Sequence, residues 1–167
     1  MVWLVGDMDL KLTGDRNSRV KQAWNETVTD EDLVLVVGNL GNLSFEETDK
    51  FFGELNGRKK ILVDSVTRFN KEEKYKNVSL TSTEGFSTNE SIEVRIPKTK
   101  ENFEIYKSHN YYVAAPRSIS GEEKVYNNRI LSISIDDWEL YPISYERLPQ
   151  IVEDMESYEK MEAEEVQ

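Results

Sequence analysis

Short apolar runs in the first half of the chain predict strands that are buried on both faces. Residues 2–5 (VWLV) and 33–37 (LVLVV) are continuous and rich in valine and leucine, as are the interior strands of parallel sheets. Residues 59–63 (KKILV) predict a third strand of the same kind. These three runs therefore predict the centre of a sheet.

Two amphipathic segments separate these runs. The first predicts a helix, because apolar residues recur at spacings of three and four: Val20, Ala23, Trp24 and Val28. The second begins at Ser44, and Glu47 three residues later completes a capping box. Strands and helices that alternate in this way indicate an α/β fold with a parallel sheet and right-handed crossovers.

The second half of the chain has a different pattern. Residues 91–96, 111–115 and 130–135 predict further strands. The first and last of these alternate apolar and polar residues, as half-exposed antiparallel strands do. Residues 65–90 have little periodicity, and we interpret them as a loop with a short strand near Val78.

The chain ends in a predicted helix over about residues 146–160, followed by an acidic tail over 161–167. The apolar face of this helix consists of Leu148, Ile151, Val152 and Met155. Neither a linker nor an internal repeat divides the sequence. Residues 1–167 are therefore predicted to form one domain around one core.

The chain is strongly acidic. Its 167 residues carry a formal net charge of -11, and residues 153–167 (EDMESYEKMEAEEVQ) hold seven acids and one lysine. Binding of a phosphate backbone requires a basic face, so nucleic acid is not an expected partner, whereas a basic protein is. The absence of cysteine excludes disulfides and thiolate metal sites. With no membrane-spanning run and no secretory signal recognised, a cytoplasmic location is expected.

Four phrases follow one another in a distinctive order: VWLVGDMDL, QAWNETVTDEDLVLVVGNLGN, ELNGRKKILVDSVTR and NNRILSISIDDWELYPISYERL. In this order and spacing they resemble the small bacterial and phage calcineurin-like metallophosphoesterases. The resemblance covers the chain apart from about residues 69–125. It implies a metallophosphoesterase-like two-sheet sandwich with flanking helices, in which carboxylates and histidines at the strand ends hold two metal ions.

Most of that family's metal ligands are replaced in this sequence. At the D-x-H motif Asp7 matches and Asp9 takes the histidine position, while at the G-D motif Asn39 replaces the aspartate that bridges the metals. The G-N-H-D block falls on residues 65–68 and ends in Arg68. The resemblance therefore implies remnant positions at Asp7, Asp9 and Asn39, with no catalytic residue and no bound metal expected.

The late G-H-x-H motif falls near residues 114–118, where Pro116 and Ser118 take the histidine positions. The single histidine of the chain, His109, does not align with this motif. A two-metal site needs a bridging carboxylate and several neutral imidazoles, so this sequence does not predict the family's chemistry. Arg16, near the start of the first helix, could bind an anion but is interpreted as a surface arginine.

Three functions are open at this point, and the first is preferred. It is a pseudoenzyme that acts by binding a protein partner and needs no cofactor. The second is a phosphodiesterase with an atypical carboxylate site at Asp7, Asp9 and Asn39, where one weakly bound divalent cation could lie. The third is a nucleotide- or phosphate-binding module without hydrolysis, in which Arg68 and Arg117 contact the anion.

Overall fold

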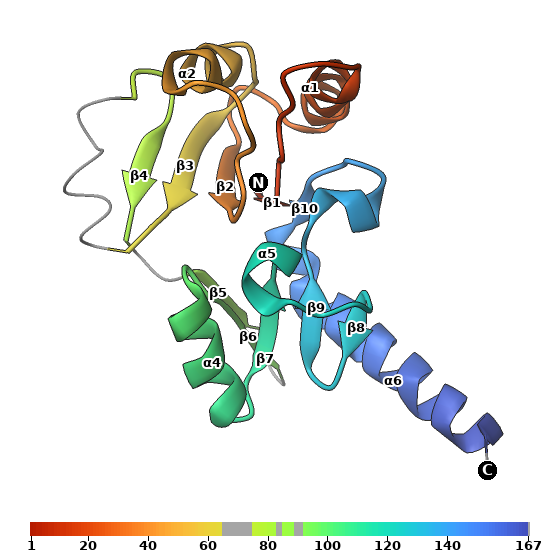
Figure 1. The fold of residues 1–167 in the computed structure, drawn as a ribbon. Helices are drawn as coiled ribbons and strands as arrows, with labels where there is room; N and C mark the ends of the chain where they lie inside the picture. The colour runs from red at the N-terminus through yellow and green to blue at the C-terminus, as the bar shows by residue number, and fades with distance from the viewer. Residues whose placement is uncertain (65–74, 83–84, 89–91, 167) are drawn as a thin grey trace.

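The computed structural model describes residues 1–64, 75–82, 85–88 and 92–166. Within this part of the chain, two five-stranded sheets are flanked by helices, and most neighbouring strands run parallel. Figure 1 shows the first sheet with α1 and α2 in the upper half of the view, and the second sheet with α4 in the lower half. The predicted α/β class is confirmed, whereas the metallophosphoesterase sandwich remains a prediction.

The first sheet has the order β10-β1-β2-β3-β4, and its strands β1, β2 and β3 correspond to the three predicted apolar runs. Its strands are β1 (Val2–Gly6), β2 (Leu33–Val37), β3 (Arg58–Leu62), β4 (Ser79–Thr81) and β10 (Ile143–Ser144). Strands β1 to β4 pair in parallel, while β10 pairs antiparallel with β1. Strand β4 confirms the short strand predicted near Val78.

The two predicted helices of the first half are α1 (Arg16–Thr27) and α2 (Phe45–Gly53). Trp24 from α1 and Phe52 from α2 belong to one buried cluster with apolar residues of the first sheet. The predicted capping box is confirmed in part, because Ser44 Oγ accepts a hydrogen bond from the Glu47 N–H at 3.1 Å. These helices therefore cover one face of the first sheet.

The second sheet has the order β5-β6-β7-β9-β8. Its strands are β5 (Gly85–Thr88), β6 (Glu93–Ile96), β7 (Tyr112–Ala115), β8 (Tyr126–Asn127) and β9 (Ile130–Ser132). Strands β6 and β9 both pair in parallel with β7, and they are antiparallel only to the outer strands β5 and β8. The prediction of half-exposed antiparallel strands at 91–96 and 130–135 is therefore wrong for the pairing with β7.

The exposure predicted for residues 130–135 is also wrong, because all six residues are buried. The two serines that suggested a solvent-facing side, Ser132 and Ser134, are each 2% exposed. A hydroxyl can be buried when it is hydrogen-bonded, and Ser132 donates to Asp137 while Ser134 donates to Asp7. The alternation of polar and apolar residues here reflects a buried polar network.

Sequence analysis does not predict β5 or the helix α4 (Lys100–Ser108). Thr99 caps the N-terminus of α4, and its side chain accepts a hydrogen bond from the Asn102 N–H at 3.1 Å. Its buried side chains are Phe103 and Tyr106. The shorter helices are α5 (Arg117–Ser120), η1 (Ile135–Trp138) and η2 (Tyr145–Arg147).

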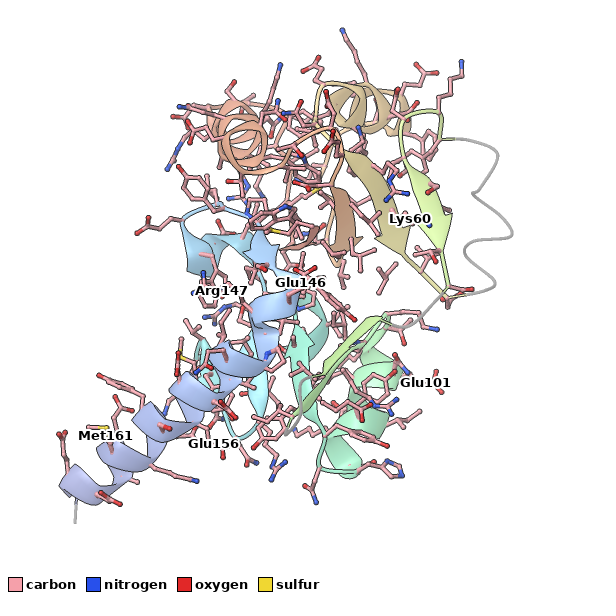
Figure 2. The ribbon with its side chains drawn as sticks, turned by 180° about the vertical axis from the view of Figure 1, so that it is seen from behind. Lys60, Glu101, Glu146, Arg147, Glu156 and Met161 are labelled. Carbon is pink, nitrogen blue, oxygen red and sulfur yellow. The ribbon has the colours of Figure 1, made fainter. Side chains whose placement is uncertain are left out.

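Helix α6 (Leu148–Val166) continues through the acidic segment instead of ending near residue 160. On its predicted apolar face, Leu148 and Val152 are fully buried, whereas Ile151 and Met155 are partly buried. Farther along, Glu156 accepts a hydrogen bond from the Tyr112 hydroxyl at 2.7 Å. Glu159 still accepts a hydrogen bond from the Asn128 N–H at 3.1 Å, and the helix after it projects from the sheets, as Figures 1 and 2 show. In the described part of the chain, no helix is both long and apolar enough to cross a membrane.

Candidate functional site

The candidate site lies where the carboxyl ends of strands from both sheets meet. Asp7 follows β1 directly, and its N–H donates to the Val37 carbonyl at the end of β2 at 3.0 Å. The Gly6 N–H donates to the Ile133 carbonyl at 3.1 Å, and Gly6 forms a parallel bridge with Ser134 just after β9. Carboxyl ends of parallel strands are a common position for ligands in α/β folds.

The Asp7 carboxylate, in a residue that is 8% exposed, is held entirely by protein donors. Its Oδ1 accepts from the Asn39 N–H at 2.9 Å and from Ser118 Oγ, and its Oδ2 accepts from the Ser118 N–H at 3.1 Å and from Ser134 Oγ at 2.6 Å. A carboxylate has about four lone-pair positions in total. Donors from the described residues therefore fill the acceptor capacity of Asp7.

Gly38 allows this close approach. Its φ of +92° lies in the left-handed region, and a Cβ at this position would overlap Asp7 Oδ1 and lie 2.8 Å from Ser118 Oγ. The glycine that the resemblance placed in the G-D motif thus makes room for the carboxylate and the serine. Any larger residue at position 38 would push the Asp7 carboxylate and Ser118 apart.

Asp9 is the second carboxylate of the predicted site, and its side chain is 27% exposed. It forms an ion pair with Lys11 at 3.0 Å and accepts a hydrogen bond from Asn39 Nδ2 at 3.3 Å. Asn39 in turn accepts a hydrogen bond from the Gly41 N–H through its Oδ1 at 3.0 Å. The structure therefore brings Asp7, Asp9 and Asn39 together, and all three already have protein partners.

Arg16 fixes the loop that carries both carboxylates. Asp7 and Asp9 have φ values of 51° and 48°, which is unusual for residues other than glycine. Arg16 Nε donates to the Asp9 carbonyl at 2.8 Å, Nη2 donates to the Met8 carbonyl at 2.9 Å, and Nη1 contacts Asp136 at 2.6 Å. With a side chain only 19% exposed, Arg16 is a structural residue of the site, and its interpretation as a surface arginine is wrong.

Arg117, one of the two predicted anion contacts, is held by a carboxylate of the same chain. Its Nε and Nη2 donate to Asp137 at 2.7 and 2.9 Å, and Nη1 donates to the carbonyls of Glu122 and Glu123. The hydrogen bond with Asp137 raises the pKa of Arg117. Burial raises the pKa of Asp137, but the hydrogen bonds from Arg117 and Ser132 outweigh this and lower it. Arg68, the other predicted contact, lies outside the described residues.

A cleft of about 460 Å³ opens beside Asn39 and Ser118, at the carboxyl end of β3. Among the described residues that line it, Lys98 is the cation, and Lys98 Nζ donates to the Ser82 carbonyl at 3.0 Å. His109 lies at the end of α4, with Nδ1 2.8 Å from the Ile105 carbonyl oxygen. Among the residues that the structure describes, no three histidine, aspartate or glutamate side chains are grouped so that they could hold a metal ion.

The sequence patterns assign no role to Ser134. They identify Ser118 only as a residue in a histidine position, although Ser118 contacts Asp7 through both its N–H and its hydroxyl. Ser134 occurs in an alternating segment, where a serine normally indicates a solvent-facing position. One signal could have indicated that these serines are buried. Residues 130–135 directly precede two acids, Asp136 and Asp137.

Comparison with known proteins adds information on the fold alone. No protein-family model and no curated protein matches this chain. The chain is similar in structure to a crystal structure titled as that of the protein of unknown function AQ665 from Aquifex aeolicus, with a TM-score of 0.56 and 12% sequence identity. The match covers 93% of this chain and 98% of the other. This likeness supports the α/β architecture and assigns no activity.

Proposed function

We propose that this chain is a catalytically inactive, metallophosphoesterase-like protein that acts by binding, with a basic protein as its partner. One observation carries the proposal: the Asp7 carboxylate accepts four hydrogen bonds from Asn39, Ser118 and Ser134. In the family that the sequence resembles, the aspartate at this position binds metal. Here the same position is used to join the ends of the strands.

Metal binding at Asp7 would have to replace these donors. A hydrogen bond to a charged group contributes about 1.5 to 3 kcal/mol, so a cation that displaced two of them would lose several kcal/mol of protein stability. Asn39, at the bridging position, has a neutral amide, which neutralises two cations poorly. The phosphate-binding alternative has less support, because the guanidinium of Arg117 is already paired with Asp137.

The acidic half of α6 is the surface that we assign to the partner. Residues 160–165 are all exposed, and three of them are glutamates. Tyr158 and Met161 add exposed apolar area on the same projecting segment, at 62% and 59% exposure. An acidic surface with apolar residues favours a basic, amphipathic segment of another protein, because opposite charges attract the partner and apolar contacts hold it.

Metal analysis tests the inactive site. We expect the purified protein, dialysed against Mn²⁺ or Mg²⁺, to retain no stoichiometric metal and to leave bis(nitrophenyl) phosphate unhydrolysed. A double variant, Ser118→Ala with Ser134→Ala, frees two acceptor positions on Asp7 and should bind Mg²⁺ more tightly than the wild type. The matched control is Ser108→Ala with Ser144→Ala, whose hydroxyls bond elsewhere.

Two results would contradict the proposal. The first is about two metal ions per wild-type chain, the stoichiometry of a two-metal site, with hydrolysis that Asp7→Asn abolishes. The second is a folded double variant that binds Mg²⁺ no better than the wild type. That result would mean that the serine donors are not what keeps a cation from Asp7.

A further inference from the structure

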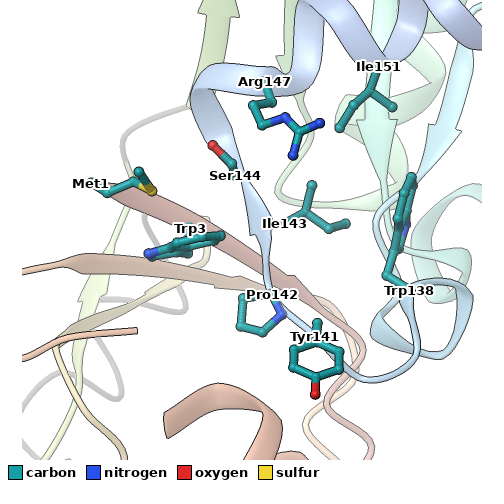
Figure 3. A pocket seen from close by; sticks show the side chains of 9 residues that line it. All are labelled: Met1, Trp3, Trp138, Tyr141, Pro142, Ile143, Ser144, Arg147 and Ile151. Carbon is teal, nitrogen blue, oxygen red and sulfur yellow. The ribbon is translucent and has the colours of Figure 1, made fainter. Parts of the chain in front are cut away.

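A second cavity, of about 400 Å³, lies near the start of β1 and shares no lining residue with the Asp7 site (Figure 3). It is lined by Met1, Trp3, Trp138, Tyr141, Pro142, Ile143, Ser144, Arg147 and Ile151. These residues come from the start of the chain and β1, from η1, β10 and the segment between them, from η2 and from the start of α6. The volume is within the range of about 300 to 1,000 Å³ that is usual for small-molecule sites.

Three aromatic rings line the cavity, and their orientation is fixed from outside. Each ring donates its polar hydrogen to a residue that does not line the cavity: Trp3 Nε1 to Asp32 at 3.1 Å, Trp138 Nε1 to the Ser132 carbonyl at 2.9 Å, and the Tyr141 hydroxyl to Glu26 at 2.9 Å. The rings therefore present apolar surface to the cavity. Because these hydrogen bonds hold the rings in place, the rings need little reorganisation when a ligand enters.

Arg147 gives the cavity its charge. Figure 3 shows its guanidinium pointing toward the space between Ile143 and Ile151. No hydrogen bond or ion pair joins the Arg147 side chain to any residue that the structure describes, in contrast to Arg16 and Arg117. Helix α6 begins at the next residue and has no acid in its first turn, so the positive end of its dipole lies beside Arg147.

The sign of this charge selects the ligand. Three aromatic rings alone would also suit a cation, which binds over ring faces. A guanidinium at the same cavity repels a cation, and its planar, bidentate geometry matches a carboxylate or a similar oxyanion. A flat apolar body with one acidic group would satisfy both the rings and the arginine.

We propose that this cavity binds a small planar aromatic anion, such as an aryl carboxylate, with its ring among Trp3, Trp138 and Tyr141 and its acidic group on Arg147. The cavity requires neither Asp7 nor the acidic half of α6. The inference therefore goes beyond the proposed function, and each can fail without the other.

A matched pair of fluorescent probes tests the proposal. Anilinonaphthalene sulfonate carries the aromatic body and the negative charge, whereas phenylnaphthylamine has the same ring system without the sulfonate. Both should bind the wild-type protein. Arg147→Gln should weaken the sulfonate probe about tenfold or more, as the loss of a charge-assisted contact implies, and should change the neutral probe less than about twofold.

Two further variants make the result specific. Tyr141→Ala removes a half-exposed wall and should weaken both probes, while Arg58→Gln, at an exposed arginine outside the cavity, should weaken neither. Equal binding of the sulfonate probe to Arg147→Gln and the wild type would overturn the proposal. So would a dimer that excludes the probes and dissociates in Tyr141→Ala, because a second copy of the chain would then occupy the cavity.

Discussion

The Ser134 hydroxyl should contribute more to stability than its size suggests. It donates to Asp7 at 2.6 Å and accepts the Arg117 N–H at 2.8 Å, in a residue that is 2% exposed. Ser134→Ala leaves a buried carboxylate and a backbone N–H short of a partner. We expect a loss of about 2 kcal/mol in the free energy of unfolding, measured by urea denaturation. Ser108→Ala, at an exposed serine, should change it by less than about 0.5 kcal/mol, and equal losses would contradict the role of Ser134.

At the residue scale, the sequence shows which side chains at the site are charged but not which groups form hydrogen bonds with them. Asp7 and Asn39 could be placed together through the resemblance, which assigns both to strand ends, and each follows an apolar run after one glycine. The donors to Asp7 could not be predicted, because Ser118 and Ser134 are far from Asp7 in the chain and serine has no preference strong enough to reveal burial. The resemblance pointed to Asp7 and Asn39 but not to the hydrogen bonds that fill the acceptor capacity of Asp7.

Helix α6 combines a docked half and a projecting half, and the two should differ in their effect on stability. Leu148 is fully buried, so Leu148→Ala should lower the free energy of unfolding by about 2 to 5 kcal/mol. Truncation after Met161 removes residues that are exposed over 162–165, and should lower it by less than about 0.5 kcal/mol. Thermal denaturation followed by circular dichroism measures both. Equal sensitivity of the two variants would mean that the helix is packed along its whole length.

The two halves of the chain differ in how far their elements could be predicted. In the first half β1 and β2 lie on continuous apolar runs, and a helix with a clear period follows each of them, whereas β3 (RKKIL) and β4 (SLT) begin with polar residues. In the second half β9 is short, and two buried serines, Ser132 in the strand and Ser134 just after it, donate hydrogen bonds to Asp137 and Asp7. Alternation cannot distinguish such a segment from a half-exposed strand, because both contain a polar residue at every second position. Helix α4 was not predicted, because its buried face consists of only two residues, Phe103 and Tyr106.

At the scale of the whole molecule, more than half of the net charge of -11 lies in residues 153–167, which hold seven acids and one lysine, and this concentration predicts how a partner is captured. Glu162→Lys with Glu165→Lys should greatly reduce capture of a basic protein from a bacterial lysate. Glu101→Lys with Glu104→Lys, the matched reversal on exposed residues of α4, should not. Capture should also fall as salt is raised, because the screening length shrinks from about 10 Å at 0.1 M to about 3 Å at 1 M. If Asp7→Asn abolishes capture while the α6 reversal is silent, the partner or ligand binds at the strand ends, and the proposed role of α6 fails.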